Sequence, residues 1–413
     1  MQEQSRYAVG IDIGTTTIRA VVGHIDPATG TPTIVGVGKA PNTGMRKGTV
    51  VNLAGPAHAI DEALGEAERM SGYEVNAATV SINGAHIVST KADGMIAVGM
   101  ADHEITDEDL GRIEEVATVG KIPANREILE VVPFSYILDG QGGVKDPLGM
   151  TGTRLEITAN VVSAMAPYVA SLQKTVEMAT VSPSAVVPAV MASAKAVVHE
   201  SQIESGVAVV DMGGSTTGVA VFEEGDLQCV GVIPVGGAAI TNDLAIGLKT
   251  DPDIAEKVKI AHASAVPRKE AEGISIKHDG EIYSFSTSDI DEIVEARLEE
   301  IFEAVQKELK KAGRAGKLPS GVILTGGTAN VKHMAEYAKE QLGLAVRTGK
   351  PGGFGGVADG VDKPEFAAAV GLMLIDAEGA PQQMSPAKSK KSGTSSMKQA
   401  GGLLKSIFGK FKA

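Results

Sequence analysis

The sequence predicts an α/β protein of two lobes that face each other across a cleft. Residues 10–22 (GIDIGTTTIRAVV) and 209–221 (VVDMGGSTTGVAV) share one pattern: an apolar run, Asp-x-Gly, a threonine cluster and a second apolar run. The two segments lie about half the chain apart, as expected for a duplicated α/β domain. Two unrelated hairpins with glycine turns would give the same pattern, and the residues alone leave that alternative open.

The first lobe is predicted to open with three strands and a helix. Residues 7–23 read as two strands, because apolar β-branched residues flank a short Gly/Thr turn. Residues 33–38 continue as a third strand. Residues 56–71 fit a helix, because their apolar residues recur on one face.

The middle and the end of the chain differ from this opening. Residues 84–162 contain an acidic helix candidate at 106–119 and a loop-rich run, and they predict a small inserted α+β domain. A long helix fits residues 289–312. Residues 322–330 (VILTGGTAN) predict a buried strand that breaks at a glycine pair.

Composition excludes several classes of protein. The 413 residues are enough for two or more domains. Aromatic residues make up 3% and tryptophan is absent, which argues against base stacking with single-stranded nucleic acid. The single Cys229 argues against a disulfide framework or structural zinc and suits a reducing compartment. We expect no signal peptide, and no apolar run approaches the roughly 20 residues that span a bilayer.

Charge is unevenly distributed along the chain. The formal net charge is −13, and the last 28 residues contribute seven lysines and no acid, which leaves −20 for residues 1–385. An acidic body of this kind repels nucleic acid, so we expect no nucleic-acid partner. Residues 377–400 are small, polar and rich in Pro, Ser and Lys, and they predict a flexible linker.

The terminal segment 401–413 (GGLLKSIFGKFKA) has the pattern of an amphipathic helix. At about 100° per residue, its five large apolar side chains share an arc of roughly 140°. We expect this helix to lie in an anionic membrane surface, although docking on the acidic body is an alternative. The membrane-binding residues would be Leu403, Leu404, Lys405, Ile407, Phe408, Lys410, Phe411 and Lys412.

Three glycine-rich loops predict phosphate and nucleotide binding. Backbone N–H groups can approach a phosphate only where glycine permits it, and Ser or Thr hydroxyls add donors. Two such loops each follow an aspartate, Asp12 or Asp211, that could hold Mg²⁺ through water. The third, Gly326-Gly327, ends a strand. Neither GxxxxGK[ST] nor an early GxGxxG is present, which argues against a P-loop and a dinucleotide fold.

The order DxGTT, DxGGxTT, TGG resembles the nucleotide-binding superfamily of actin, sugar kinases and heat-shock chaperones, and within it the FtsA family of actin-like bacterial cell-division proteins. The resemblance covers nearly the whole chain, and DPLGMTGTRLE is its most specific part because nucleotide binding does not require it. The matching motifs beyond the loops are residues 44–50 (GMRKGTV), 81–87 (SINGAHI), 146–156 (DPLGMTGTRLE), 236–245 (GGAAITNDLA), 255–259 (AEKVK) and the amphipathic terminus.

The resemblance implies an ATP site with Mg²⁺ held near Asp12 and Asp211, and at most slow hydrolysis with Asp211 orienting the water. Thr17 stands where actin has a phosphate-binding lysine, which predicts a missing cation, and Ser215 replaces a more usual glycine. The implied ATP-binding residues are Asp12, Gly14, Thr15, Thr16, Thr17, Asp211, Gly213, Gly214, Ser215, Thr216, Thr217, Gly236, Gly237, Glu256, Lys259, Gly326 and Gly327.

The resemblance also implies a domain plan. An FtsA-type insert, placed differently from actin's, would interrupt lobe 1, and the smaller part of lobe 2 would bind the C-terminal peptide of FtsZ through Arg297 and Glu300. Ala296 stands where the family commonly has proline. The expected ranges are lobe 1 at 1–83 and 163–200, the insert at 84–162, lobe 2 at 201–243 and 305–379, its smaller subdomain at 244–304, the linker at 380–400 and the membrane helix at 401–413.

The implied function is that of an ATP-binding, polymer-forming adaptor that tethers FtsZ filaments to the cytoplasmic face of the cell membrane at the division site. Head-to-tail self-association and contacts with other division proteins would use the insert. Two alternatives remain open: an ATP-dependent enzyme of the same superfamily, and an actin-like binding module of pilus assembly. Neither alternative accounts for the basic amphipathic terminus, and the pilus type would also lack the DPLGMTGTRLE stretch.

Overall fold

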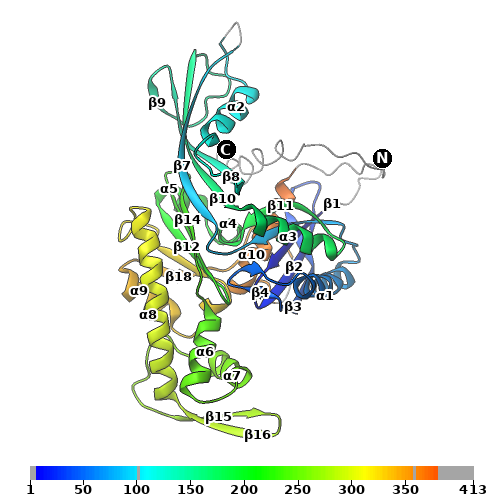
Figure 1. Ribbon diagram of the computed structural model, residues 1–413, viewed down its shortest axis with the longest axis vertical. Helices are drawn as coiled ribbons and strands as arrows, with labels where there is room; N and C mark the ends of the chain where they lie inside the picture. Colours follow the sequence, from blue (N-terminus) through cyan, green and yellow to red (C-terminus); the bar gives the residue numbers. More distant parts are fainter. Residues whose placement is uncertain (1–5, 100–102, 357–359, 380–413) are drawn as a thin grey trace.

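The computed structural model describes residues 6–99, 103–356 and 360–379. The predicted linker at 380–400 and membrane helix at 401–413 lie outside these residues. The described chain forms two α/β lobes and a third, smaller unit beyond them (Figure 1). Among the described helices, none combines the length and the hydropathy needed to cross a membrane.

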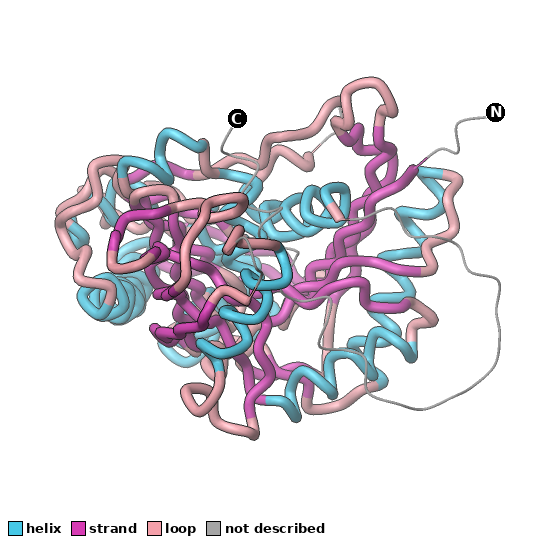
Figure 2. Tube along the Cα trace, turned by 90° about the horizontal axis from the view of Figure 1, so that it is seen from above, coloured by secondary structure: helices cyan, strands magenta, loops and turns pink. Residues whose placement is uncertain are grey.

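The first lobe is a five-stranded sheet with helices on both faces, which Figure 2 shows from above. Helix α1 presses against β3 so closely that a Cβ on Gly38 would lie 1.8 Å from the Ala63 carbonyl oxygen. On the opposite face, a Cβ on Gly10 would lie 2.3 Å from the Ala369 oxygen of α10. The sheet order is β11 (Ser182–Pro188), β6 (Ala77–Ile82), β1 (Arg6–Ile13), β2 (Thr17–Ile25) and β3 (Pro32–Pro41), and the helices are α1 (Ala54–Ser71), α3 (Ala166–Met178), α4 (Ala189–Val197) and α10 (Ala367–Glu378).

The second lobe repeats this unit. Its first strand pairs in parallel with one neighbour and forms an antiparallel hairpin with the next, as β1 does with β6 and β2. The same strand order in both lobes confirms the predicted two-lobed fold and sets aside the reading of two unrelated hairpins. The strands are β18 (Val346–Thr348), β17 (Val322–Thr325), β12 (Val207–Met212), β13 (Thr217–Glu223) and β14 (Asp226–Ile233), in that order.

The helices of the second lobe follow from simple sequence signals. Long α8 (Thr287–Lys311) begins where the Ser286 hydroxyl accepts a hydrogen bond from the Ser288 N–H at 3.2 Å, and it buries an apolar stripe. Two lysines in its last turn complement the helix dipole. The other elements are α5 (Glu200–Ser205), α6 (Gly237–Gly247), α7 (Pro252–His262), α9 (Met334–Leu342) and the hairpin β15 (Gly273–His278) and β16 (Glu281–Ser286).

The smaller unit is an antiparallel sheet covered by one helix. Thr106 and Asp109 form a capping box that starts this helix, and Leu110 and Ile113 bury its apolar face. Its sheet continues the sheet of the second lobe, because β7 lies beside β14. The elements are β7 (Val88–Ala97), α2 (Asp107–Thr118), β8 (Arg126–Leu138), β9 (Gln141–Val144) and β10 (Arg154–Met165).

The predicted elements can be compared with these bounds. The helices expected at 56–71, 106–119 and 289–312 correspond to α1, α2 and α8, and the strand expected at 322 ends at Thr325. The predicted domain boundaries stay predictions, and four of them, at 162, 200, 243 and 304, fall inside β10, α5, α6 and α8.

The insert is attached to both lobes. The chain enters and leaves it from lobe 1, yet its contacts also reach β14 of lobe 2. The Ser89 hydroxyl accepts from Val230 N–H at 2.9 Å and donates to the Val230 oxygen at 3.2 Å, and the Asn160 amide donates to the Leu227 oxygen at 3.2 Å. Lys145 of the insert pairs with Asp226. We call this set of contacts the β7–β14 clasp.

The clasp can be tested with a disulfide. The Ser89 hydroxyl lies 3.8 Å from the Cys229 sulfur, so Ser89→Cys should form a disulfide with the only native cysteine under mild oxidation. Mass spectrometry of the monomer should show the loss of two hydrogens. The double variant Ser89→Cys, Cys229→Ser is the matched control. A Ser89→Cys monomer that keeps two free thiols under oxidation would contradict the clasp.

Candidate functional site

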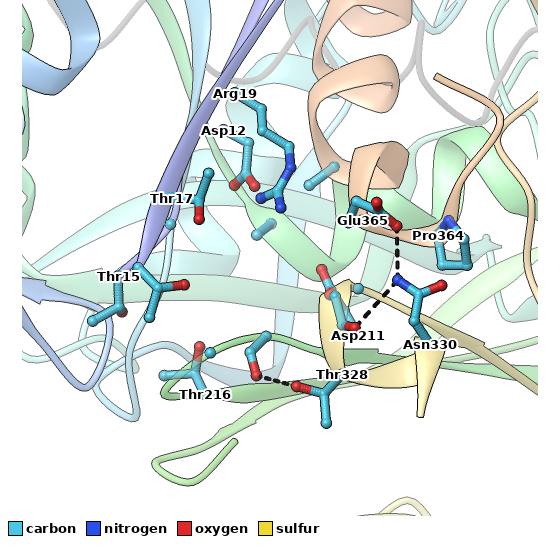
Figure 3. A pocket seen from close by; sticks show the side chains of 18 of the residues that line it. Asp12, Thr15, Thr17, Arg19, Asp211, Thr216, Thr328, Asn330, Pro364 and Glu365 are labelled. Atoms are coloured by element: carbon cyan, nitrogen blue, oxygen red, sulfur yellow. Dashed lines mark hydrogen bonds between the residues drawn. The ribbon is translucent and has the colours of Figure 1, made fainter. Parts of the chain in front are cut away.

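A cavity of about 360 Å³ lies between the two lobes, a size that suits a small-molecule ligand. Figure 3 shows its walls: Asp12, Thr15, Thr17 and Arg19 come from the first lobe, and Asp211, Thr216, Thr328 and Asn330 from the second. The ends of hairpins β1–β2 and β12–β13 meet here. A Cβ on Gly214 would lie 2.7 Å from the Thr16 side chain, so the two loops are in contact.

The first loop is held by two neighbouring segments. The Asn42 amide donates to the Gly14 oxygen at 2.7 Å, and the Gly48 N–H donates to the Thr15 hydroxyl at 3.1 Å. Gly48 belongs to the turn between β4 (Met45–Arg46) and β5 (Thr49–Val50), within the GMRKGTV motif. Because the Thr15 oxygen accepts this bond, its own hydrogen remains available to an anionic ligand.

The second loop is tied to the structure behind it. The Gly213 N–H donates to the Thr216 oxygen at 2.8 Å, and the Gly213 oxygen accepts from the Thr328 hydroxyl at 2.9 Å. Thr328 lies in η1 (Gly327–Asn330), which follows Gly326. Gly326 has φ +83°, and a Cβ there would lie 2.4 Å from the Asp211 carboxylate, so only glycine fits.

Asp12 and Asp211 place two carboxylates in one cavity. The Ser81 hydroxyl donates to Asp12 at 2.9 Å and the Ser193 hydroxyl to Asp211 at 2.8 Å. Burial raises the pKa of Asp211 to about 6, and the negative charge of Asp12 adds to the effect. Burial also raises the pKa of Asp12, which the Arg19 guanidinium and the Ser81 hydroxyl partly offset.

Arg19 corrects one expectation from the sequence. Thr17 was expected to leave the first loop without a cation, but Arg19 lines the same cavity. The physical reason is the strand period: residues two apart on β2 point to the same face, so Arg19 follows Thr17. Arg19 is also the direct cross-strand partner of Asp12 in the β1–β2 ladder, which places a cation beside the carboxylates.

The far end of the cavity is formed by α6, α7 and the segments around Gly327. Glu256 and Lys259 line it, and their side chains pair at 2.6 Å. On the other wall the Asn330 amide donates to Glu365 at 2.8 Å and to the Gly327 oxygen at 3.2 Å. Glu365 belongs to η2 (Pro364–Phe366). Figure 3 shows the Asn330–Glu365 bond at the end opposite Thr15.

Most of the predicted ATP-binding residues line this cavity, but four do not. Thr217 is fully buried and its hydroxyl donates to the Val235 oxygen at 2.9 Å. The Gly237 N–H donates to the Gly213 oxygen at 3.0 Å, and a Cβ on Gly236 would lie 2.4 Å from that oxygen. Ser215 is also absent from the lining. Thr217, Gly236 and Gly237 therefore support the second loop from behind.

Sequence reasoning missed several lining residues. Arg19 could have been found from the hairpin register, since it faces Asp12 across the turn. Asn83 lies within SINGAHI, a motif that was noted without a role. Glu365 follows no recognised motif, so only the fold brings it here. The missed residues include Arg19, Asn83, Ala189, Ile260, Thr328, Asn330, Val331, Pro364, Glu365 and Ala368.

Arg297 and Glu300 lie on α8, outside the cavity lining. The Arg297 Nε donates to the Asp243 carboxylate of α6 at 2.6 Å, and a second nitrogen pairs with Glu300. Asp243 therefore holds the pKa of Arg297 above its ordinary value. The two predicted FtsZ-binding residues, Arg297 and Glu300, therefore contact each other. The Asp243 and Glu300 carboxylates already neutralise the guanidinium charge.

The cavity chemistry fits a nucleotide with a divalent cation. Loop amides and threonine hydroxyls are donors, Arg19 is a cation, and Asp12 and Asp211 offer the oxygen ligands that Mg²⁺ prefers alongside water. No cluster of three or more metal-ligating side chains was found within residues 6–99, 103–356 and 360–379. A magnesium ion here would thus depend on water and phosphate oxygens for most of its ligands.

The raised pKa of Asp211 predicts a pH-dependent stability. Because the native state disfavours ionised Asp211, protonation of this carboxyl stabilises the fold at low pH. That stabilisation is lost as pH rises from about 4 through about 6. In chelator and without nucleotide, Asp211→Asn should therefore raise the free energy of unfolding at pH 7.5, by up to ~3 kcal/mol. The difference should shrink near pH 4.5. Chemical denaturation of the variant and the parent protein at both pH values checks this. An equal difference in the free energy of unfolding at pH 7.5 and pH 4.5 would contradict it.

Comparison with known proteins gives the family. The family model described as "Cell division protein FtsA" matches residues 208–371, and the model "SHS2 domain inserted in FTSA" matches residues 84–163. The FtsA of Pseudomonas aeruginosa is 35% identical over 376 residues, covering 90% of this chain and 89% of that protein. The FtsA of Bacillus subtilis is 34% identical over 369 residues, covering 88% of this chain and 82% of that protein.

Two solved structures align with most of the chain at low sequence identity. The PilM–PilN type IV pilus biogenesis complex aligns with a TM-score of 0.65 at 17% identity, over 90% of this chain and 99% of that one. MreB5 of Spiroplasma citri bound to ADP aligns with a TM-score of 0.53 at 13% identity, over 90% of this chain and 96% of that one. These likenesses show an actin-like fold. Together with the identity to curated relatives over nine-tenths of the chain, they confirm that this protein belongs to the FtsA family of cell-division proteins.

Proposed function

We propose that this cell-division protein is an ATP-binding, polymer-forming adaptor that tethers FtsZ filaments to the cytoplasmic membrane at the division site. One observation carries the proposal: a two-loop cavity with paired aspartates occurs in a chain that also has the FtsA-specific inserted domain. An enzyme of the same superfamily would give no reason for the basic amphipathic terminus, and the family assignment argues against the pilus-assembly alternative.

In this proposal ATP lies with its phosphates against both loops. Thr15 and the loop amides donate to phosphate oxygens, and Arg19 neutralises part of their charge. Asp12 and Asp211 hold Mg²⁺ through water, and the ion would supply further neutralisation of the phosphates. Asp211 can also orient a water molecule toward the terminal phosphate, which gives at most slow hydrolysis. The related fold of MreB5 has been solved with ADP and with AMPPNP, which supports a nucleotide here.

Polymerisation is proposed from the fold and the insert. MamK, whose structure is a double helical filament, aligns with a TM-score of 0.52 over 91% of this chain. In our proposal the lobes associate head to tail, and the inserted domain supplies contacts to the next subunit and to other division proteins.

Two further surfaces complete the adaptor. Arg297 and Glu300 on α8 would receive the C-terminal peptide of FtsZ, whose acidic groups can compete with Asp243 for the guanidinium. The terminal segment 401–413, outside the described residues, would bind anionic lipid. Each lysine near such a surface contributes about 1 kcal/mol, and many copies in a polymer would bind far more firmly than one.

Sedimentation with lipid vesicles tests the adaptor. The full chain with ATP should pellet with vesicles that contain phosphatidylglycerol and should carry FtsZ with it. A 1–397 truncation should leave both proteins in the supernatant, because it lacks the apolar face and four lysines. Neutral vesicles are the lipid control. If the full chain stays in the supernatant, or pellets without FtsZ, the proposed function is lost.

Arg297→Ala tests the FtsZ surface. Losing a charge-assisted hydrogen bond to the peptide should reduce FtsZ recruitment about tenfold, with vesicle binding by the variant itself unchanged. Lys307→Ala is the matched control, because Lys307 lies on the same helix with its side chain 71% exposed. Thermal unfolding checks that both variants fold. Equal recruitment by Arg297→Ala and the parent protein would remove Arg297 from the site.

A further inference from the structure

Resting on the proposed nucleotide binding, we propose that Asn83 recognises the terminal phosphate of a nucleoside triphosphate, and that the turn after it transmits the presence of that phosphate to the inserted domain. Asn83 lies in residues 81–87 (SINGAHI), a motif to which the proposed function gives no role. It belongs to neither glycine loop and is not one of the paired aspartates. Asn83 would thus distinguish a triphosphate from a diphosphate.

The topology of lobe 1 brings Asn83 to the phosphate end of the cavity. Strand β6 lies parallel to β1, so the carboxyl ends of both strands reach the same edge of the sheet. Near the end of β6, the Ser81 hydroxyl donates to Asp12 at 2.9 Å. Asn83 comes two residues later and lines the cavity.

The side-chain amide of Asn83 is available to a ligand, because it makes no hydrogen bond with the described part of the chain. Its backbone, in contrast, is held in place. A Cβ on Gly48 would lie 3.0 Å from the Asn83 Cβ and 2.8 Å from the Gly84 nitrogen. The Gly48 N–H donates to the Thr15 hydroxyl at 3.1 Å. The β4–β5 turn therefore fixes Asn83 beside the first loop.

An amide at this position matches the terminal phosphate. In the proposed pose the phosphates lie against both loops, and the nucleoside extends toward the end of the cavity that α6, α7 and Gly327 of lobe 2 form. The phosphate farthest from the nucleoside is then the one nearest to Asp12 and Asn83 of lobe 1. An amide N–H that donates to a phosphate oxygen forms a charge-assisted hydrogen bond. A diphosphate leaves this donor without its partner.

Only a tight turn separates Asn83 from the inserted domain. Gly84 has φ +121°, and a Cβ there would lie 2.8 Å from the His86 ring, so only glycine fits. The Ile87 N–H donates to the Gly84 oxygen at 3.0 Å, and β7 of the insert begins at the next residue, Val88. The turn therefore has little room to change its shape.

His86 connects this turn to the insert and to lobe 1. Its oxygen accepts a hydrogen bond from the Arg126 guanidinium of β8 at 2.5 Å. Its ring packs against Tyr168 of α3, with the ring centroids 4.6 Å apart. A displacement of Asn83 at the phosphate is thus passed through a continuous set of contacts to β7 and β8.

Calorimetric titration of the full chain with AMPPNP and with ADP, both in Mg²⁺, tests the recognition. Asn83→Ala should weaken AMPPNP binding about tenfold, the value of one hydrogen bond to a charged group, and leave ADP binding nearly unchanged. Asn76→Ala is the matched control, because Asn76 immediately precedes the other end of β6 and is exposed. ADP binding also checks that each variant folds.

Hydrogen exchange at saturating nucleotide tests the transmission, at a protein concentration where sedimentation shows only monomer. Residues 84–97 and 126–134 of the parent protein should exchange at rates that differ severalfold between AMPPNP and ADP. In Asn83→Ala this difference should be lost although the cavity is occupied. In Asn76→Ala it should remain.

The outcomes separate this inference from the proposed function. If Asn83→Ala weakens AMPPNP and ADP equally, or weakens neither, recognition by Asn83 is overturned while nucleotide binding stands. If the parent protein exchanges alike with both nucleotides, or if Asn83→Ala keeps the difference, transmission through residues 83–87 is overturned. If the parent protein binds neither nucleotide, the proposed function fails and the inference fails with it.

Discussion

Two carboxylates, Asp12 and Asp211, face one cavity from opposite lobes, and the rest of the site is arranged around their charge. Removing a carboxylate from water is costly: burial raises the pKa of both groups, and the charge of Asp12 raises that of Asp211 further. Ser81, Ser193 and Arg19 each offset part of that cost. In our proposal, a divalent cation with its nucleotide would offset the negative charge that remains. Glycine on both loops is required by the protein itself, because a Cβ would lie 2.5 Å from the Thr17 oxygen at Gly14 and 2.7 Å from the Thr16 side chain at Gly214.

The fold and both loops could be predicted from the sequence because their signals are local. A hairpin turn, an Asp-x-Gly and a threonine cluster occupy a dozen consecutive residues, and the same set recurs in the second lobe. Arg19 was missed because its place in the cavity depends on strand register rather than on the turn. Gly236 and Gly237 show the opposite error, since a glycine pair before a helix suggests a ligand loop but packs here against Gly213.

The contacts that join distant segments could not be predicted. Asp243 precedes Arg297 by 54 residues, and no sequence pattern in α6 predicts that the two side chains form an ion pair. The same holds for Asn330 with Glu365 and for Thr241 with Glu256, which meet only because two helices or two short turns are packed together. The side-chain contacts around this cavity therefore depend on tertiary placement, whereas the loops predicted to bind phosphate are encoded in short stretches of chain.

The β7–β14 clasp gives the two lobes a second connection in addition to the segments of chain that pass between them. The chain passes from lobe 1 to lobe 2 between β11 and β12 and returns between β18 and α10. The insert, covalently part of lobe 1, is also hydrogen-bonded to β14 of lobe 2. A two-lobed body with one hinge can open freely, but a body with a second connection cannot. Any rotation of one lobe must slide β7 along β14 or swing the insert as a lever about its junction, where Arg126 holds the His86 oxygen. A rotation between the lobes would therefore also change the position of the insert relative to at least one of them.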